Sequence, residues 1–372
     1  MPQWESDRHD GGVPESLRVA YTLEQLWHDV PGGTAVSALK VLDELGRRND
    51  VEMVAVAGRH RRPPRQAFAP PTAVASLPLG RPWLYETWNR VDWPKVESVT
   101  GDVDVCHSTV AIPAATQAPH VVTVHDVAFV HAPERFTAHG VRVMRRGLDR
   151  CRRADLVLCP SRATADALAD LDFDLERIRV VPWGVDPVRV TPRDVERVRA
   201  TLGLPAEFVL FVGTIEPRKN LPALAAATAR LSLPLVVVGA EGWGDVQIDA
   251  DVGATADIRF VGFVPHRELA AVYAAASVFA YPSLEEGFGM PILEAMAAGV
   301  PVVTSAGGAT EEAAGGAAVL VDPRDVDSIA AGLDSAATDR DRLVGLGARH
   351  SSSSTWSAAA DATVAAYREV AR

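Results

Sequence analysis

Short runs of apolar residues alternate with longer amphipathic stretches along the chain from Leu17 onward. The short runs predict buried strands, and the stretches whose apolar residues recur every three or four positions predict helices. Strands that alternate with helices are typical of parallel sheets in α/β domains. The predicted strands are residues 17–21, 51–57, 103–106, 120–124, 155–159, 179–181, 208–212, 235–238, 258–261, 277–280, 301–304 and 318–321.

This series falls into two halves. A segment rich in Pro and Gly ends near Pro187 and is followed by charged residues, which predicts a domain boundary there. We therefore expect an α/β protein with two Rossmann-like parallel-sheet domains, at residues 17–187 and 188–354. An amphipathic helix is expected at 356–370, within a final segment 355–372. The natural ligand site is the cleft between the two domains.

Three segments of the first half are less regular. We expect a turn at 31–34 before a helix at 35–48, and an irregular, aromatic-rich loop at 59–94. Aromatic rings can stack on sugars, although anchoring of a loop by buried rings is the more common role. A strongly basic helix is predicted at 140–154. Its apolar face would consist of Val141, Met144, Leu148 and Cys151.

Composition narrows the class of protein. The chain has 372 residues, 48% hydrophobic and 23% charged, which describes a globular protein with substantial cores. A formal net charge of −11 argues against nonspecific binding of nucleic acids. Three widely spaced cysteines indicate a reducing compartment. Residues 1–16 are polar, so we expect a disordered tail rather than a signal peptide, and a cytoplasmic protein.

The basic helix at 140–154 is also a candidate for contact with a membrane surface. A helix with arginines on one face can rest on anionic lipid at the inner face of the membrane. An ordinary solvated face explains the same pattern more simply. The sequence gives no indication of an oligomeric state.

The stretch from Ser283 to Pro301 carries the strongest candidate chemistry. It holds two carboxylates, Glu286 and Glu294, with seven residues between them. Pro291 suits the first turn of a helix, so we expect Glu294 on a short helix and Glu286 on the glycine-containing loop before it. Such a loop can bind phosphate through its N–H groups. Alternatively, Glu294 only complements the helix dipole and Glu286 is solvated.

Other candidate groups also follow predicted strands. His125 lies directly after the strand at 120–124, and Arg218 and Lys219 lie on the loop that leaves the strand at 208–212. Strand ends of open α/β sheets are where ligands gather. We see no metal-ligand spacing, so the cations would have to neutralise a phosphate. Three or four charge-assisted hydrogen bonds of about 1.5–3 kcal/mol each can do so. One of the two carboxylates can accept hydrogen bonds from ribose hydroxyls, and the other can hold the hydroxyls of a sugar. Cations and carboxylates together therefore fit a nucleotide-diphosphate sugar as the ligand.

From Leu17 onward the chain resembles the retaining, metal-independent glycosyltransferases of the GT-B architecture with a Glu-x7-Glu signature. Matching segments are residues 212–220 (VGTIEPRKN), 260–265 (FVGFVP), 283–299 and 320–323 (LVDP). The resemblance implies that the final helix returns to the first domain and that no cofactor is needed besides the donor substrate. It implies that Glu294 binds the ribose and that Glu286 binds the transferred sugar together with the backbone of Gly287, Phe288 and Gly289. It also implies that Arg218 and Lys219 bind the diphosphate and that Phe263 and Val264 border the base. His125 would lie near the reacting carbon, and Gly33 would lie near the diphosphate.

Two positions depart from that family's pattern. Many relatives carry a basic residue where this chain has Thr214, which shifts the grip on phosphate towards Arg218. Relatives often have Asn where Trp183 stands here, so packing at the hinge differs. Residues 122–129 (VTVHDVAF) and 213–220 are similar to bacterial polysaccharide mannosyltransferases. GDP-mannose is therefore the expected donor.

The acceptor and the rival functions stay open at this point. A glycan, a lipid-linked glycan and a small molecule are all compatible with the sequence, and the acceptor is expected against residues 59–93 and the basic helix. A nucleotide-sugar epimerase on the same double fold is one alternative, and a non-catalytic carbohydrate-binding protein is another. A nicotinamide dehydrogenase is disfavoured because the full G-x-G-x-x-G fingerprint is absent.

Overall fold

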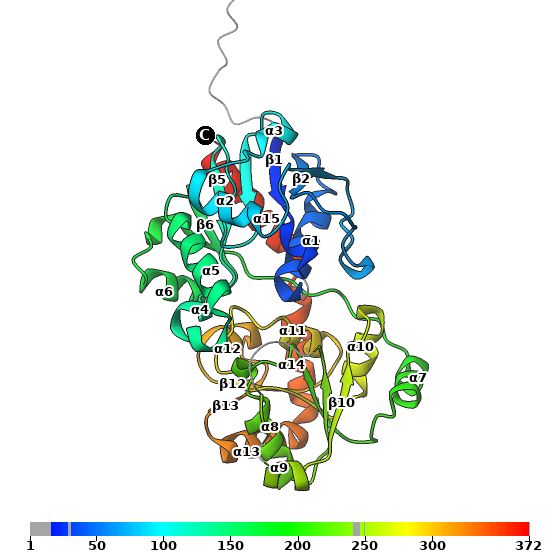
Figure 1. Cartoon of the computed structure of the whole chain (residues 1–372). Coiled ribbons are helices and arrows are strands. Elements are labelled where there is room, and N and C mark those ends of the chain that lie inside the picture. Colours follow the sequence, from blue (N-terminus) through cyan, green and yellow to red (C-terminus); the bar gives the residue numbers. More distant parts are fainter. Residues whose placement is uncertain (1–15, 29–30, 241–245, 249, 372) are drawn as a thin grey trace, which may run out of the picture.

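A computed structural model describes residues 16–28, 31–240, 246–248 and 250–371. The predicted tail at 1–16 lies outside these residues except for Ser16. Within the described residues there are two parallel sheets, of seven and six strands, which form the upper and lower halves of Figure 1. The two predicted Rossmann-like domains are therefore confirmed. No helix of the described residues is both long enough and apolar enough to cross a membrane.

The N-terminal sheet has the strand order β3-β2-β1-β4-β5-β6-β7. Its strands form where the apolar runs are, because a parallel sheet covered by helices buries both faces of each strand. The strands are β1 Leu17–Thr22, β2 Val51–Ala57, β3 Val74–Ser76, β4 Val105–Ser108, β5 His120–Thr123, β6 Leu156–Cys159 and β7 Ile178–Val180. The helices are α1 Gly32–Leu45, α2 Trp83–Val91, α3 Glu97–Thr100, α4 Ala128–His131, α5 Ala138–Cys151 and α6 Arg162–Ala169.

The C-terminal sheet has the order β10-β9-β8-β11-β12-β13. Its strands are β8 Val209–Val212, β9 Leu235–Val238, β10 Ile258–Gly262, β11 Val278–Tyr281, β12 Val302–Ser305 and β13 Val319–Val321. Its helices are α7 Pro192–Leu202, α8 Leu221–Arg230, α9 Ala250–Thr255, α10 His266–Ala275, α11 Met290–Ala297, α12 Gly308–Ala314, α13 Val326–Thr338 and α14 Arg340–Ser353. The chain ends with α15 Trp356–Val370, whose bounds are those predicted.

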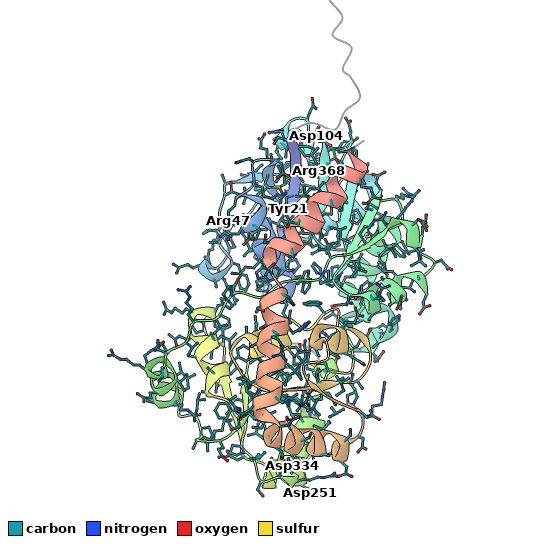
Figure 2. All side chains as sticks on the ribbon, turned by 180° about the vertical axis from the view of Figure 1, so that it is seen from behind. Tyr21, Arg47, Asp104, Asp251, Asp334 and Arg368 are labelled. Atoms are coloured by element: carbon teal, nitrogen blue, oxygen red, sulfur yellow. The ribbon has the colours of Figure 1, made fainter. Side chains whose placement is uncertain are left out.

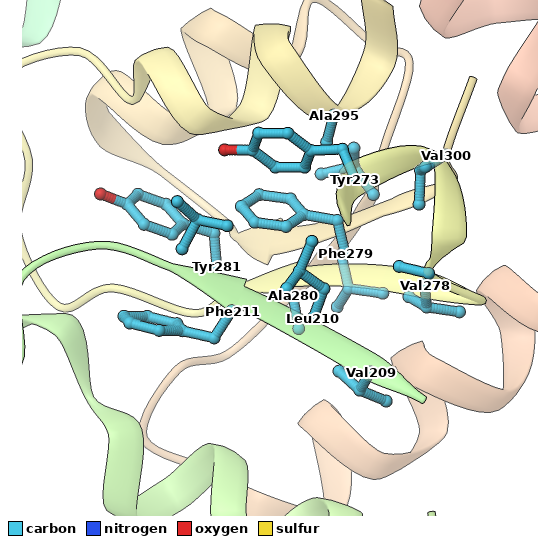
Figure 3. Close-up of a cluster of buried hydrophobic side chains, with 14 of the residues drawn as sticks. Val209, Leu210, Phe211, Tyr273, Val278, Phe279, Ala280, Tyr281, Ala295 and Val300 are labelled. Atoms are coloured by element: carbon cyan, nitrogen blue, oxygen red, sulfur yellow. The ribbon is translucent and has the colours of Figure 1, made fainter. Parts of the chain in front are cut away.

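A row of aromatic side chains fills the core of the C-terminal half (Figure 3). Phe211, Tyr281 and Phe279 stack with ring centroids about 6 Å apart, and Tyr273 meets Phe279 edge-on at 5.4 Å. Figure 3 shows the hydroxyl groups of Tyr273 and Tyr281 pointing to the same side of this row. The row therefore brings two hydroxyls from a hydrophobic core to one edge of it.

Helix α15 joins the two halves a second time. In Figure 2, α14 runs through the C-terminal half and α15 continues along the N-terminal half as far as Arg368. The two crossing segments touch where a Cβ on Gly184 would lie 2.2 Å from the backbone N of Trp356, so the two backbones are in close contact. Further along, α15 packs on α1 and β5, and the Tyr367 hydroxyl lies 2.7 Å from His107 Nδ1.

Three local predictions were wrong. Residues 31–34 do not form a separate turn, because α1 begins at Gly32 with Pro31 as its N-cap. The segment 59–94 is not wholly irregular, since residues 74–76 form β3, which pairs with β2, and residues 83–91 form α2. Its apolar residues recur at helical spacing and bury one face: Leu84, Tyr85 and Trp88.

The apolar face of the basic helix also differs from the prediction. Helix α5 buries Val143, Gly147, Leu148 and Cys151, whereas Val141 and Met144 are only half-buried. A Cβ on Gly147 would lie 2.2 Å from the carbonyl oxygen of Ala111. The helix therefore turns its glycine inward, where a close backbone contact is available, and this rotates Val141 and Met144 towards the edge, whereas Leu148 and Cys151 are buried as predicted.

Candidate active site

The loop that carries Glu286 starts at the end of β11, which pairs with β8. Strand order in the C-terminal sheet reverses between these two strands, and ligands of open α/β sheets gather at such a point. Gly289 has a φ of 109° and is the N-cap of α11. Glu286 thus lies on the loop and Glu294 lies in the helix, as the position of Pro291 predicted.

The same loop touches the N-terminal half. Ser161 Oγ donates a hydrogen bond to the carbonyl oxygen of Gly287 at 2.8 Å, and Thr164 Oγ1 donates to it at 3.3 Å. A Cβ on Gly287 would lie 2.0 Å from the carbonyl oxygen of His125, so only glycine fits there. Nearby, the Glu312 carboxylate accepts hydrogen bonds from the first two N–H groups of α6, at 2.7 and 2.6 Å. These contacts bring His125 against the glutamate loop.

A buried cluster of charges lies where β8 and β11 end. Glu286 accepts hydrogen bonds from Arg218 Nη1 and from Lys219 Nζ, each at 2.6 Å. Glu216 is 2% exposed and binds Arg218 Nη2 at 2.8 Å. Lys219 Nζ also donates to the hydroxyl of Tyr281, one of the two hydroxyls at the edge of the aromatic row. Two cations and two carboxylates therefore share one buried site.

The electrostatics of this cluster follow from burial and pairing. Burial raises the pKa of Glu286, but the charges of Arg218 and Lys219 outweigh it and lower the pKa to about 2. Burial and the like charge of Arg218 lower the pKa of Lys219, against the opposing effect of Glu286. Burial raises the pKa of Glu216, although Arg218 opposes this. Glu286 is thus the carboxylate that both cations hold in its ionised form.

Glu294 belongs to a second cluster. Its Oε2 accepts a hydrogen bond from the Tyr273 hydroxyl at 2.8 Å, and burial raises the pKa of its carboxyl group. Close by, Asp186 of the segment between the domains binds Lys40 Nζ at 2.5 Å and faces His266 Nε2 at 3.4 Å. Hydrogen bonding to His266, supported by Lys40, lowers the pKa of Asp186 to about 2. Lys40 of α1 and His266 of α10 therefore act on the Glu294 carboxylate together with Tyr273 and Asp186.

His125 is held in one orientation at the interface. Its Nε2 lies 2.7 Å from the carbonyl oxygen of Thr109, which can only accept, so Nε2 carries the proton and Nδ1 is an acceptor. Nδ1 is buried and has no partner in the described part of the chain. Burial lowers the pKa of His125. Trp183 lies between His125 and Phe288, with ring centroids 5.2 and 5.4 Å away.

Comparison with known proteins decides the family. Residues 31–189 match the family described as Glycosyltransferase Family 4, and residues 193–350 match Glycosyl transferases group 1. O-antigen chain mannosyltransferase B of Escherichia coli is 33% identical over 266 residues, which cover 67% of this chain and 70% of that protein. The chain belongs to the glycosyltransferases that combine these two domains, Glycosyltransferase Family 4 and Glycosyl transferases group 1. D-inositol 3-phosphate glycosyltransferase of Nocardia farcinica is 28% identical over 90% of this chain and 84% of that one.

Solved structures of other glycosyltransferases share the fold. Sucrose-phosphate synthase from Thermosynechococcus elongatus superposes with a TM-score of 0.70 at 21% identity, over 96% of this chain and 99% of that one. Anabaena Alr3699/HepE in complex with UDP and glucose superposes with a TM-score of 0.66 at 20% identity, over 91% and 94%. The two sheets of this glycosyltransferase therefore have the GT-B arrangement.

The remaining predicted residues of the glycosyltransferase lie around the same interface. Gly33, in the first turn of α1, faces α11, since its Cβ would lie 3.0 Å from Met290 Cε. Phe263 is 66% exposed at the end of β10, whereas Val264 belongs to the core. Phe288 is buried, and its ring packs edge-on against Trp183. The structure thus brings Arg218, Lys219 and Glu286 together and holds Glu294 in a separate cluster.

Sequence reasoning missed several functional side chains. Glu216 and Tyr281 complete the charge cluster, Tyr273 holds Glu294, and Ser161 and Glu312 hold the two halves together. Glu216 could have been found, because it stands two residues before Arg218 on the loop that leaves β8. Tyr281 ends β11, five residues before Glu286, whereas Tyr273, Ser161 and Glu312 lie further from the residues they contact. No group of three or more His, Cys, Asp or Glu side chains within the described residues is placed to hold a metal ion.

Proposed function

We propose that this glycosyltransferase transfers mannose from GDP-mannose to a hydroxyl group of a glycan acceptor, with retention at the anomeric carbon and without a divalent metal. The 33%-identical O-antigen mannosyltransferase supports the choice of sugar and of acceptor class. The observation that carries the donor class is the buried pair of Arg218 and Lys219 at the strand reversal. Two adjacent cations there match the charge of a diphosphate.

Donor binding would rearrange the charge cluster. In the structure the two oxygens of Glu286 pair with Arg218 and Lys219, and Glu216 supplies the second negative charge. A diphosphate binding to Arg218 and Lys219 replaces the carboxylate as their anion. Glu286 is then released to accept hydrogen bonds from sugar hydroxyls. Glu216 keeps Arg218 in place during this exchange, because it binds the other guanidinium nitrogen at 2.8 Å.

The other residues around the interface take supporting roles in this proposal. Glu294 accepts hydrogen bonds from the ribose hydroxyls, and the backbone near Phe263 and Val264 borders the base. The backbone N–H groups of residues 287–289 contact the sugar, and Gly33 allows the diphosphate to approach α1. His125 accepts a hydrogen bond from a sugar hydroxyl through Nδ1, which lacks a partner among the described residues.

The transfer step is proposed to take place on one face of the sugar. The bond from C1 to the β-phosphate oxygen breaks, and the bond from C1 to the acceptor oxygen forms on the same side. The acceptor proton moves to a phosphate oxygen of the leaving GDP. Arg218 and Lys219 stabilise the negative charge that develops there. Glu286 positions the sugar in this route; in the alternative double displacement it would attack C1.

A second acceptor class is favoured by the relatives that are D-inositol 3-phosphate glycosyltransferases. An acceptor of that kind carries a phosphate, whereas a glycan chain offers neutral hydroxyls. The donor could differ as well, because the structural neighbour from Anabaena was crystallised with UDP and glucose.

The decisive experiment is a donor screen followed by acceptor assays. Binding of GDP-mannose, UDP-glucose and UDP-N-acetylglucosamine is measured by calorimetry, and slow donor hydrolysis is followed without acceptor. We expect GDP-mannose to bind most tightly and Lys219→Met to reduce turnover by about 10²–10³. The anomeric configuration of the product is read by NMR. The donor assignment would be overturned if a UDP-sugar bound most tightly. The acceptor assignment would be overturned by transfer to inositol phosphate but not to mannose oligosaccharides, and the metal-independent mechanism by loss of activity in EDTA.

A further inference from the structure

A second surface of the molecule combines exposed aromatic and basic side chains. Trp83 at the start of α2 is 68% exposed, Val91 at its end is 64% exposed and Trp93 just beyond is 52% exposed. Exposure of large apolar side chains to water is unfavourable compared with their burial, and groups of such side chains mark sites of interaction. They gather on one helix, whose opposite face is buried.

Helix α5 lies beside α2 and supplies the charge. Residues 138–153 contain six arginines and one carboxylate, in a chain whose net charge is −11. Asn89 of α2 donates to the carbonyl oxygen of Val143 at 3.1 Å, and Arg150 of α5 binds Asp92 at 2.9 Å, so the two helices form one continuous surface. Figure 1 shows them on the same side of the N-terminal half.

A groove of about 630 Å³ runs along the outer edge of α5. Phe136 and Val141 give it an apolar lining, and Arg142, Arg145 and Arg146 stand around it, together with the carboxylates of Glu134 and Asp149. Arg142 contacts His139 and Arg145 contacts the carbonyl oxygen of Val130. Neither has a carboxylate partner among the described residues, so their charges are available to an anion.

We infer that the surface formed by α2, residues 92–93 and α5 docks this protein on an anionic lipid bilayer. Tryptophans are favoured at the boundary between headgroups and acyl chains, and arginines are attracted to anionic headgroups. A free phosphate ion or a phosphorylated sugar could bind the arginines, but it would leave Trp83, Val91 and Trp93 in water. An anionic bilayer surface satisfies both halves of the pattern. This inference does not depend on the donor proposed above.

The position of the surface has a consequence for the acceptor. Helix α4 follows directly after His125 and Asp126 and packs on α5. His131 at its end lies 3.2 Å from the carboxylate of Glu285, next to Glu286. In Figure 1, α4 lies between α5 and the C-terminal half. A bilayer on this surface would therefore lie beside the active site, where it could present an acceptor carried on a lipid.

The test uses the full chain and vesicles of phosphatidylcholine alone or with about 30% phosphatidylglycerol, in flotation assays at low and at ~0.15 M salt. We expect binding only to the anionic vesicles, a blue shift of tryptophan fluorescence and weakening by salt. Arg142→Gln with Arg145→Gln should weaken binding by about 30-fold, since each basic residue near the surface contributes about fivefold. Trp83→Ser with Trp93→Ser should remove the blue shift and weaken binding by at least tenfold.

The matched control is Arg193→Gln with Arg267→Gln, which removes the same charge from exposed positions of the C-terminal half. It should bind vesicles like the wild type. Donor hydrolysis should be unchanged in all three variants, which shows that each is folded. Equal binding to both kinds of vesicle, equal loss in the control, or binding of inorganic phosphate without any binding of vesicles would overturn the inference.

Discussion

The contact between Gly287 and His125 offers the sharpest test of how the two halves form one site. In Gly287→Ala the new Cβ would lie 2.0 Å from the His125 carbonyl oxygen and 2.9 Å from its carbonyl carbon. A carbon and an oxygen that are not bonded stay about 3.3 Å apart, so the two segments must separate by about 1.3 Å. Backbone lies on both sides, and no side-chain rotation can relieve the overlap. The φ of Gly287 is not in the left-handed region, so the obstacle is space alone.

This displacement should reach the reacting groups. Glu286 precedes Gly287 directly, and the hydrogen bonds from Ser161 and Thr164 end on the carbonyl oxygen of Gly287. A misplacement of about 1 Å can cost about 10²-fold in rate. We expect kcat to fall by about that factor, and stability to fall by about 1–3 kcal/mol as the two hydrogen bonds lengthen. Donor affinity should change less, because Glu294 and Arg218 keep their other contacts.

Steady-state kinetics of donor hydrolysis, calorimetric donor binding and thermal unfolding together measure these effects. Gly345→Ala is the control, because its Cβ would meet only Arg349 Nη1 at 3.8 Å within α14. An alanine inside a helix should be neutral or stabilising by up to ~1 kcal/mol. If Gly287→Ala kept kcat within about threefold of wild type, the interface contact would not govern catalysis, and the reasoning would be refuted.

Three further variants examine the charges. Burial raises the pKa of Glu294, and the proposed contact with the ribose needs its ionised form, so donor affinity should rise as the pH increases through that raised pKa. Glu294→Gln should bind weakly with a flat profile, and a wild-type profile that stays flat above the ordinary pKa of 4.5 would contradict this. Glu216→Gln should raise KM for the donor severalfold more than it lowers kcat, because it loosens Arg218 without removing its charge; unchanged kinetics would exclude this positioning role. Glu312→Ala removes two charge-assisted hydrogen bonds to α6, and should lower the free energy of unfolding by about 1–3 kcal/mol, measured in denaturant; a value below 0.5 would show that the contact is dispensable.

Local pattern was sufficient for the framework of this protein. An apolar run of four or five residues followed by a helix is strong evidence for a buried parallel strand, because both faces of such a strand are covered. The strand β9 and the helix α15 accordingly have the predicted bounds. The positions of Glu286 on a loop and Glu294 in a helix also follow locally, from Pro291 and the glycines beside it.

Only the tertiary structure shows which side chains from distant parts of the sequence contact each other. Arg218 and Lys219 bind Glu286 because β8 lies next to β11. The order of strands in a sheet depends on the crossover connections between them, and the pattern of apolar residues within a strand does not reveal it. The same holds for Tyr273 on Glu294. The rotation of α5 depends on the close approach of Gly147 to Ala111. This packing contact cannot be predicted from the spacing of apolar residues along the helix. Sequence determined most of the elements, although not β3 or α2, and the chemical groups that stand at their ends, whereas packing determined which of those groups meet.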